Sequence, residues 1–264
     1  MLKISHLTKT FNKGTVNERV AMNDVSLHLP TGEFVTVIGS NGAGKSTLFN
    51  LISGCYLSDN GNIELDGMDI TFIKEHKRAK TIGRIFQDPL KGTAPSMTIE
   101  ENLALAYLRS TKKNISFGIS HKDRAFFKER LAALGLGLED RMKTKMGLLS
   151  GGQRQAVTLL MSILVTPKLL LLDEHTAALD PSTADKVIEI TKDIVKENHI
   201  TTMMITHNIQ SALYLGNRTI MMDNGKIILD IKDEQRENMT VEKLLELFKK
   251  ESHKELSNDR MLFS

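Results

Sequence analysis

The sequence predicts an α/β fold with a parallel sheet, an N-terminal antiparallel β-subdomain and a helical subdomain. Residues 168–173 and 201–206 are short, continuous apolar runs, which are typical of parallel strands buried on both faces. Residues 183–198 between them have helical spacing, and the order strand, helix, strand implies parallel strands joined by a right-handed crossover. From about residue 98 to 165 the pattern is helical, which indicates a helical insertion.

The N-terminal elements are expected to be strands that lead into a core strand. Leu2, Ile4 and residues 25–29 alternate in a β-like way, which predicts antiparallel strands. A Pro-Thr-Gly turn precedes residues 33–38, whose apolar run ends at a glycine-rich loop. Residues 45–52 after the loop have the pattern of a helix. The order is therefore strand, loop, helix.

The remaining elements are short strands and helices. We expect short strands within residues 63–86, of which 81–86 is the clearest. A helix is expected from residue 99 behind an N-cap at Thr98. The tail from Glu242 is amphipathic and charge-balanced. One side of this tail carries Leu244, Leu245, Leu247 and Phe248.

Composition excludes several classes of protein. Hydrophobic residues at 41% and charged residues at 25% are ordinary for a globular protein and exclude disordered and fibrous classes. The net charge of +3 is too small to indicate nucleic-acid binding, so we expect no nucleic-acid partner. The single cysteine, Cys55, excludes an internal disulfide and fits a reducing cytosol. We expect Cys55 to be a small core residue.

No segment has the pattern of a signal peptide or a membrane span. Polar residues interrupt the first six positions before an apolar region can form. The longest uncharged stretch rich in apolar residues, 155–167, is shorter than the roughly 18–20 residues needed to span a bilayer. Membrane contact is therefore expected only through a partner.

A phosphate-binding motif lies between the predicted core strand and helix. It satisfies the P-loop pattern G-x-x-x-x-G-K-S/T. Glycines let the backbone N–H groups point inward at phosphate oxygens, and the following helix adds the positive end of its dipole. Lys45 is expected to reach the β- and γ-phosphates of ATP, and the Ser46 hydroxyl to bind Mg²⁺. The motif consists of Gly39, Ser40, Asn41, Gly42, Ala43, Gly44, Lys45, Ser46 and Thr47.

Two carboxylates follow the apolar run at 169–172, where the ligands of open α/β sheets gather. Asp173 is expected to hold the Mg²⁺ shell, and Glu174 to polarise the attacking water. A solvated strand end gives the same pattern. Its pairing with the P-loop favours the catalytic interpretation.

A second phosphate-binding element precedes a helix expected over residues 154–164. A serine hydroxyl and free backbone N–H groups at a helix N-terminus suit a phosphate. One chain does not need two such elements for one nucleotide. The element is Leu149-Ser150-Gly151-Gly152-Gln153.

With these motifs in this order, the sequence resembles the ABC ATPase family over nearly its whole length. The resemblance adds a Q-loop glutamine, a D-loop and a switch histidine. These are Gln87 in Phe86-Gln87-Asp88, Ala178-Leu179-Asp180, and His207 in Thr206-His207-Asn208.

The resemblance implies roles for these residues. The signature at 149–153 would contact the γ-phosphate held by a second copy of the chain, in a head-to-tail dimer with ATP between the subunits. Gln87 would contact Mg²⁺ or water, and His207 would hydrogen-bond the γ-phosphate. Phe11 matches the aromatic that stacks on adenine, although an early phenylalanine is as often a core residue. His175 stands where the family usually has proline; it either tunes Glu174 or has no chemical role.

The resemblance also implies a cellular setting. Residues 85–106 and 173–181 look like a bacterial amino-acid importer subgroup, of the tryptophan/tyrosine or branched-chain type. The chain would then lie at the cytoplasmic face of the membrane, with separate permease subunits and an extracytoplasmic substrate-binding protein as partners. An exporter ATPase and a soluble ABC ATPase of DNA repair or translation are the alternatives. A regulatory module is disfavoured because Lys45, Gln87, Glu174 and His207 are all present.

The implied organisation is a single ABC ATPase domain over residues 1–264. Its ATP-binding core, with the β-subdomain, is expected at about 1–87 and 165–230. The helical subdomain is expected at about 88–164, and a helical tail at about 231–264.

Overall fold

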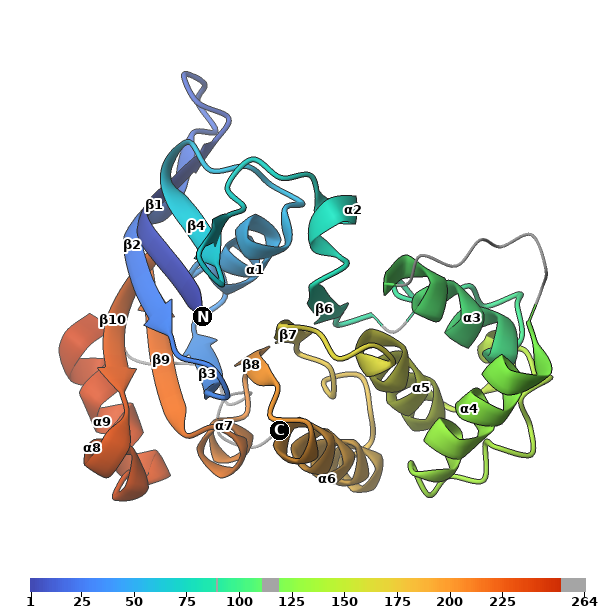
Figure 1. Cartoon of the computed structure of the whole chain (residues 1–264). Coiled ribbons are helices and arrows are strands. Elements are labelled where there is room, and N and C mark those ends of the chain that lie inside the picture. The colour runs from blue at the N-terminus through green and yellow to red at the C-terminus, as the bar shows by residue number, and fades with distance from the viewer. Residues whose placement is uncertain (89, 111–118, 253–264) are drawn as a thin grey trace. The chain divides into compact units, whose positions relative to one another are not determined.

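The structure, a computed structural model, describes residues 1–88, 90–110 and 119–252 (Figure 1). Contacts divide these residues into two compact units, one formed by 1–78 with 200–252 and one within 79–199. The subdomain limits expected from the sequence stay predictions. Parts of the expected helical subdomain and tail, 89, 111–118 and 253–264, lie outside the described residues.

An antiparallel sheet forms the N-terminal part of the first unit, with strand order β2-β1-β4-β5 (Figure 1). Leu2 pairs with Leu29 and Ile4 with Leu27, which confirms the predicted antiparallel pairing. Apolar side chains alternate inward, so Leu2, Ile4 and Leu7 are all buried. The strands are β1 (Leu2–Phe11), β2 (Arg19–Leu29), β4 (Asn60–Leu65) and β5 (Met68–Asp69).

A second set of strands in the first unit surrounds the predicted core strand, β3. This strand pairs in parallel with β8 and with β9, and β10 pairs antiparallel with β9. Every residue of β3, β8 and β9 is buried, which explains the continuous apolar runs in the sequence. The strands are β3 (Phe34–Gly39), β8 (Thr201–Ile205), β9 (Arg218–Asp223) and β10 (Lys226–Ile231).

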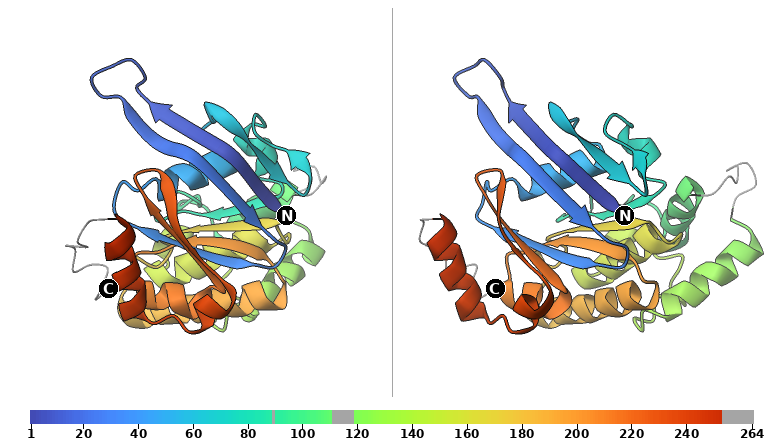
Figure 2. Two further views of the ribbon diagram at one scale, coloured as in Figure 1. Left: turned by 90° about the vertical axis from the view of Figure 1, so that its left-hand side faces the viewer. Right: turned by 60° about the vertical axis from the view of Figure 1, so that its left-hand side comes forward.

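The first unit has five helices in its described residues, and the last two, α8 and α9, follow β10. The tail helix buries Leu244 and Phe248 against Ile38, Ile209 and Ala212, which confirms its predicted apolar face. Figure 2 shows α9 beside β10, in agreement with the contacts between them. The helices are α1 (Lys45–Ser53), α2 (Glu75–Arg78), α7 (Ile209–Leu215), α8 (Asp233–Glu237) and α9 (Val241–Ser252).

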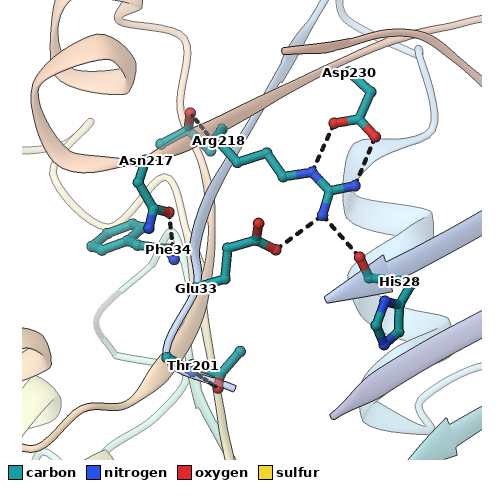
Figure 3. A network of polar contacts seen from close by, with 9 residues as sticks. His28, Glu33, Phe34, Thr201, Asn217, Arg218 and Asp230 are labelled. Carbon is teal, nitrogen blue, oxygen red and sulfur yellow. Dashed lines mark hydrogen bonds and ion pairs between the residues drawn. The ribbon is translucent and has the colours of Figure 1, made fainter. Parts of the chain in front are cut away.

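Arg218 connects the strands of the first unit at the amino-terminal end of β3 (Figure 3). Its guanidinium donates to both carboxylate oxygens of Asp230, to Glu33 and to the backbone oxygen of His28. The hydrogen bond with Asp230 is the largest contribution that raises the pKa of Arg218. One side chain thus holds β9, β10 and the turn between β2 and β3 together.

The second unit combines a parallel strand pair with helices. The apolar faces of α3, α4 and α5 enclose a core that includes Leu103, Phe127 and Leu160. Thr98 accepts from the backbone N–H of Glu101 at 3.3 Å, so the predicted N-cap is confirmed. The elements are β6 (Ile82–Ile85), α3 (Ile99–Ser110), α4 (His121–Ala132), the 3₁₀ turn η2 (Met146–Leu148), α5 (Gly151–Ile163), β7 (Leu169–Asp173) and α6 (Pro181–Glu197).

Two expectations from the sequence need correction. Cys55 is exposed rather than in the core, because α1 ends at a left-handed Gly54 that turns the chain outward. Its thiol donates to Glu75 at 2.9 Å. A helical turn at α2 also interrupts the strands expected within 63–86. Within the described part of the chain, every helix is too short or too polar to cross a bilayer.

Candidate functional site

The P-loop connects β3 to α1 in the first unit, as its sequence predicts. Two of its glycines are required by their surroundings. A side chain at Gly39, which has φ 147°, would collide with the carbonyl oxygen of Met222. At Gly44, which has φ 105°, a Cβ would lie 2.7 Å from the carbonyl oxygen of Ala21. The loop is therefore packed tightly between β2 and the end of β9.

The Lys45 side chain lies folded into this loop. It is 5% exposed, and its ammonium donates to the carbonyl oxygens of Gly39 at 2.8 Å and Ser40 at 3.1 Å. The helix begins at Lys45 behind Gly44, which supplies no side-chain cap to the first backbone N–H groups. A helix N-terminus without a side-chain cap and a nearby ammonium together favour an anion with several oxygens.

Contacts from two other segments, the start of β2 and the turn between β9 and β10, fix the shape of the loop. The guanidinium of Arg19 donates to the Gly42 oxygen at 2.8 Å, and the Gly225 N–H donates to the Ala43 oxygen at 2.9 Å. Asp223 accepts from the Ser40 hydroxyl at 3.4 Å. No local sequence pattern predicts these contacts. Asn224-Gly225 is a hairpin-turn signal, but it does not reveal that the turn faces the P-loop.

Asn41, Gly42 and Ser46 on this loop are exposed, and Thr47 is half-buried. The Ser46 hydroxyl is thus accessible in the first turn of α1, as a metal ligand must be. Phe11 is also half-buried, at the end of β1, where its cross-strand partner is Arg19, the residue that contacts Gly42. The Phe11 ring packs edge-on against Tyr56 at 5.3 Å.

His207 lies just beyond the carboxyl end of β8. The Thr206 N–H donates to the Val37 oxygen at 3.3 Å, which holds this segment beside β3. The next residue, Asn208, caps α7 by accepting from the Ser211 N–H at 2.8 Å. The half-buried His207 thus has a defined backbone position just after β8, the strand next to the one that leads into the P-loop.

The second unit carries the predicted carboxylates at the end of β7. Asp173 is the last, buried residue of the strand, and the Arg84 guanidinium from β6 lies 3.6 Å from its carboxylate. Glu174 follows with φ 47°, a left-handed conformation that is uncommon and costly for a residue other than glycine. Gln87 is exposed, just after β6, which is parallel to β7. Arg84 was not identified from the sequence.

The Ser150 segment forms the start of α5. Ser150 is the N-cap: its hydroxyl accepts from the Gln153 N–H, and the Gln153 side chain accepts from the Ser150 N–H, both at 3.3 Å. The helix begins at Gly151, three residues earlier than predicted, because this capping box offsets the low helix propensity of two glycines.

Both glycines of this segment make room for the D-loop region. A Cβ on Gly152 would collide with Thr183 of α6, and one on Gly151 would lie 3.0 Å from Leu179. Asp180 caps α6 by accepting from the Thr183 N–H at 3.1 Å. Hydrogen bonds from Thr183 lower the pKa of this carboxyl.

The chain is similar to ATP-binding proteins of transporters. Residues 22–177 match the family described as ABC transporter. The chain is 47% identical over 248 residues to the tyrosine transport ATP-binding protein of Clostridioides difficile (strain R20291), covering 94% of this chain and 98% of that protein. It is 35% identical over 232 residues to the methionine import ATP-binding protein MetN of Escherichia coli (strain K12), covering 86% of this chain and 64% of that protein.

Solved structures agree with the sequence comparison. A dimeric ATP-binding cassette in a post-hydrolysis state bound to ADP and Pi matches with a TM-score of 0.76 and 29% identity, over 88% of this chain and 98% of that one. A cassette of an ABC transporter in its ADP conformation matches with a TM-score of 0.76 and 26% identity, over 94% and 98%. Since the family match spans more than half of the chain, and the first relative nearly all of it, this chain belongs to the ABC transporter family as an ATP-binding domain.

Proposed function

We propose that the chain hydrolyses Mg-ATP to power import of an amino acid through a separate membrane permease. The observation that carries this proposal is the P-loop, where the buried Lys45 ammonium and uncapped N–H groups converge. The bound group is a triphosphate: Gly39, Ser40, Asn41, Gly42, Ala43, Gly44 and Thr47 form the loop around it, and Phe11 stacks on the adenine.

The residues for hydrolysis have separate roles in this proposal. Glu174 orients or deprotonates the attacking water, and its strained backbone fixes the direction of the carboxylate. His207 donates to the γ-phosphate, and Lys45 stabilises the charge that develops on it. Catalysis of phosphoryl transfer depends mainly on such positioning and electrostatics.

The donor set suits Mg²⁺. Ser46, Gln87 and Asp173 supply hydroxyl, amide and carboxylate oxygens, the hard ligands that this ion prefers. Ser46 and Gln87 are exposed, so an ion from solvent can reach them. The ion, when bound, neutralises phosphate charge.

The second phosphate-binding element supports a dimer. In this proposal Ser150, Gly151, Gly152 and Gln153 of one chain bind the γ-phosphate held by the P-loop of the other. Two ATP molecules then lie between two subunits related by a two-fold axis, so the same patch is used on both. The dimeric relative with ADP and Pi supports this arrangement.

The proposed partners follow from the relatives named for tyrosine transport and methionine import. They are permease subunits, for which residues 88–146 form the docking region, and an extracytoplasmic substrate-binding protein. The chain then works at the cytoplasmic face of the membrane. The 47% identity favours tyrosine or a related amino acid as cargo, and import over export or a soluble ABC function.

Hydrolysis is tested by steady-state ATPase and equilibrium ATP-binding measurements on the full chain. Lys45→Ala should lose ATP binding, whereas Glu174→Gln should bind ATP and lose turnover by about a hundredfold or more. Lys122→Ala, at an exposed lysine on α4, is the matched control and should behave as wild type. Wild-type turnover in Lys45→Ala would contradict the proposal.

Cargo is tested by uptake of labelled tyrosine in cells that lack this chain. Complementation with wild type should restore uptake, and complementation with Glu174→Gln should not. Inhibition of this uptake by unlabelled methionine or leucine then shows which amino acids compete with tyrosine for the transporter. Restored uptake with Glu174→Gln would separate transport from ATP hydrolysis and contradict the proposed coupling.

A further inference from the structure

His175, directly after the proposed catalytic carboxylate, points into the interior of the second unit. It is 3% exposed, and its Nε2 lies 3.2 Å from the hydroxyl of Thr191 on α6. Thr191 is itself fully buried. The imidazole is therefore fixed between the end of β7 and the middle of α6.

The direction of this hydrogen bond follows from the second contact of Thr191. A threonine hydroxyl has one proton, and Thr191 donates it to the Val187 carbonyl oxygen at 2.7 Å. The Thr191 oxygen therefore accepts from His175, and the proton lies on Nε2. Committed as a donor to α6 in this way, Nε2 does not accept a proton from the attacking water.

The segment between His175 and α6 is a series of tight turns. The Ala177 N–H donates to the Glu174 oxygen at 3.0 Å, and the Leu179 N–H donates to the Thr176 oxygen at 3.1 Å. Asp180 then caps α6. Glu174 has φ 47°, which persists only where surrounding contacts enforce it. The bond between His175 and Thr191 is such a contact, one residue away.

We propose that His175 is a positioning residue, which through its hydrogen bond to Thr191 holds the Glu174 carboxylate in the orientation needed for hydrolysis. The inference rests on the proposed role of Glu174. It assigns His175 to neither proton transfer nor nucleotide binding. Loss of the bond should therefore affect kcat and leave ATP affinity nearly unchanged.

The test uses Thr191, because changes there leave the residues beside Glu174 intact. Thr191→Val has nearly the same shape and removes the hydroxyl, whereas Thr191→Ser keeps it. We expect Thr191→Val to lower kcat about tenfold, with KM and the ATP dissociation constant within about twofold of wild type. Thr191→Ser should restore kcat to within about threefold of wild type.

A double-mutant cycle with His175→Ala tests whether the pair acts as a unit. The double variant should lose no more kcat than His175→Ala alone, because both changes remove one interaction. All variants are compared at a temperature at which thermal unfolding shows them folded. Wild-type kcat in Thr191→Val, an equal loss in Thr191→Ser, or additive losses would overturn the proposal.

Glu174→Gln, measured in parallel, separates the proposed role of His175 from the proposed function of the chain. If Glu174→Gln abolishes turnover while Thr191→Val does not change it, only the role of His175 fails. If Glu174→Gln turns over ATP as wild type, the proposed function itself fails.

Discussion

The Arg84 guanidinium lies 3.6 Å from the Asp173 carboxylate and 4.6 Å from the centre of the Phe86 ring. The Arg84 and Asp173 side chains are only 11% and 12% exposed. A cation so placed compensates the charge of a largely buried carboxylate that we propose as a magnesium ligand.

Arg84→Gln should lower the free energy of unfolding by about 1–3 kcal/mol, because it leaves the Asp173 carboxylate without this cation in a largely dry environment. It should also lower the Mg²⁺ concentration that half-activates ATPase, since a competing positive charge is removed. Urea denaturation and a Mg²⁺ titration measure the two effects.

Arg84→Lys is the control, because it keeps the charge and should retain most of the stability. An Arg84→Gln variant with wild-type stability and wild-type Mg²⁺ dependence would show that this ion pair has no energetic role.

Arg218→Met should destabilise the first unit by about 3 kcal/mol. The change removes a largely buried guanidinium and leaves Glu33 and Asp230 as uncompensated carboxylates, the former mostly buried (Figure 3). Urea denaturation measures the loss. Arg218→Lys keeps the charge without the bidentate geometry, so its free energy of unfolding should lie between those of wild type and Arg218→Met. A loss below about 1 kcal/mol in Arg218→Met would mean that the contacts add little beyond packing.

Phe11→Ala should raise the KM for ATP while the fold stays intact. Stacking of a base on an aromatic ring is worth about 1–3 kcal/mol, which corresponds to a rise of about five- to hundredfold. Phe11→Tyr keeps the ring and should stay near wild type. Thermal unfolding shows whether Phe11→Ala is folded. An unchanged KM, or loss of the folded state, would mean that Phe11 has a structural role and does not bind adenine.

Local patterns in the sequence were sufficient to predict most elements. The runs at β3, β7 and β8 are mainly apolar because those strands are buried on both faces, and α9 is apolar on the side that packs on α7 and β10. The P-loop could also be predicted from the sequence, since a phosphate-binding turn needs its glycines at fixed spacing.

What the sequence did not reveal depends on contacts between distant segments. Nothing local indicates that Arg19 contacts Gly42, that Arg84 lies beside Asp173, or that His175 contacts Thr191 on α6. The sequence pattern predicts that α5 begins at residue 154, whereas it begins at Gly151. Glycine has a low helix propensity, but the capping box of Ser150 and Gln153 outweighs it here.

The central claim, that two chains share each ATP, is tested by the molar mass of Glu174→Gln in solution, measured by light scattering with and without millimolar-range Mg-ATP. Removing the carboxylate charge should slow hydrolysis and trap the ATP-bound dimer, so the mass should double when ATP is added. Adding Ser150→Arg should abolish the dimer by crowding the opposite γ-phosphate, whereas adding Ser120→Arg should not. Ser120 caps α4 with the same kind of capping box, so it controls for the lost helix cap. A Glu174→Gln chain that stays monomeric with ATP, or a dimer that persists with Ser150→Arg, would contradict the composite site.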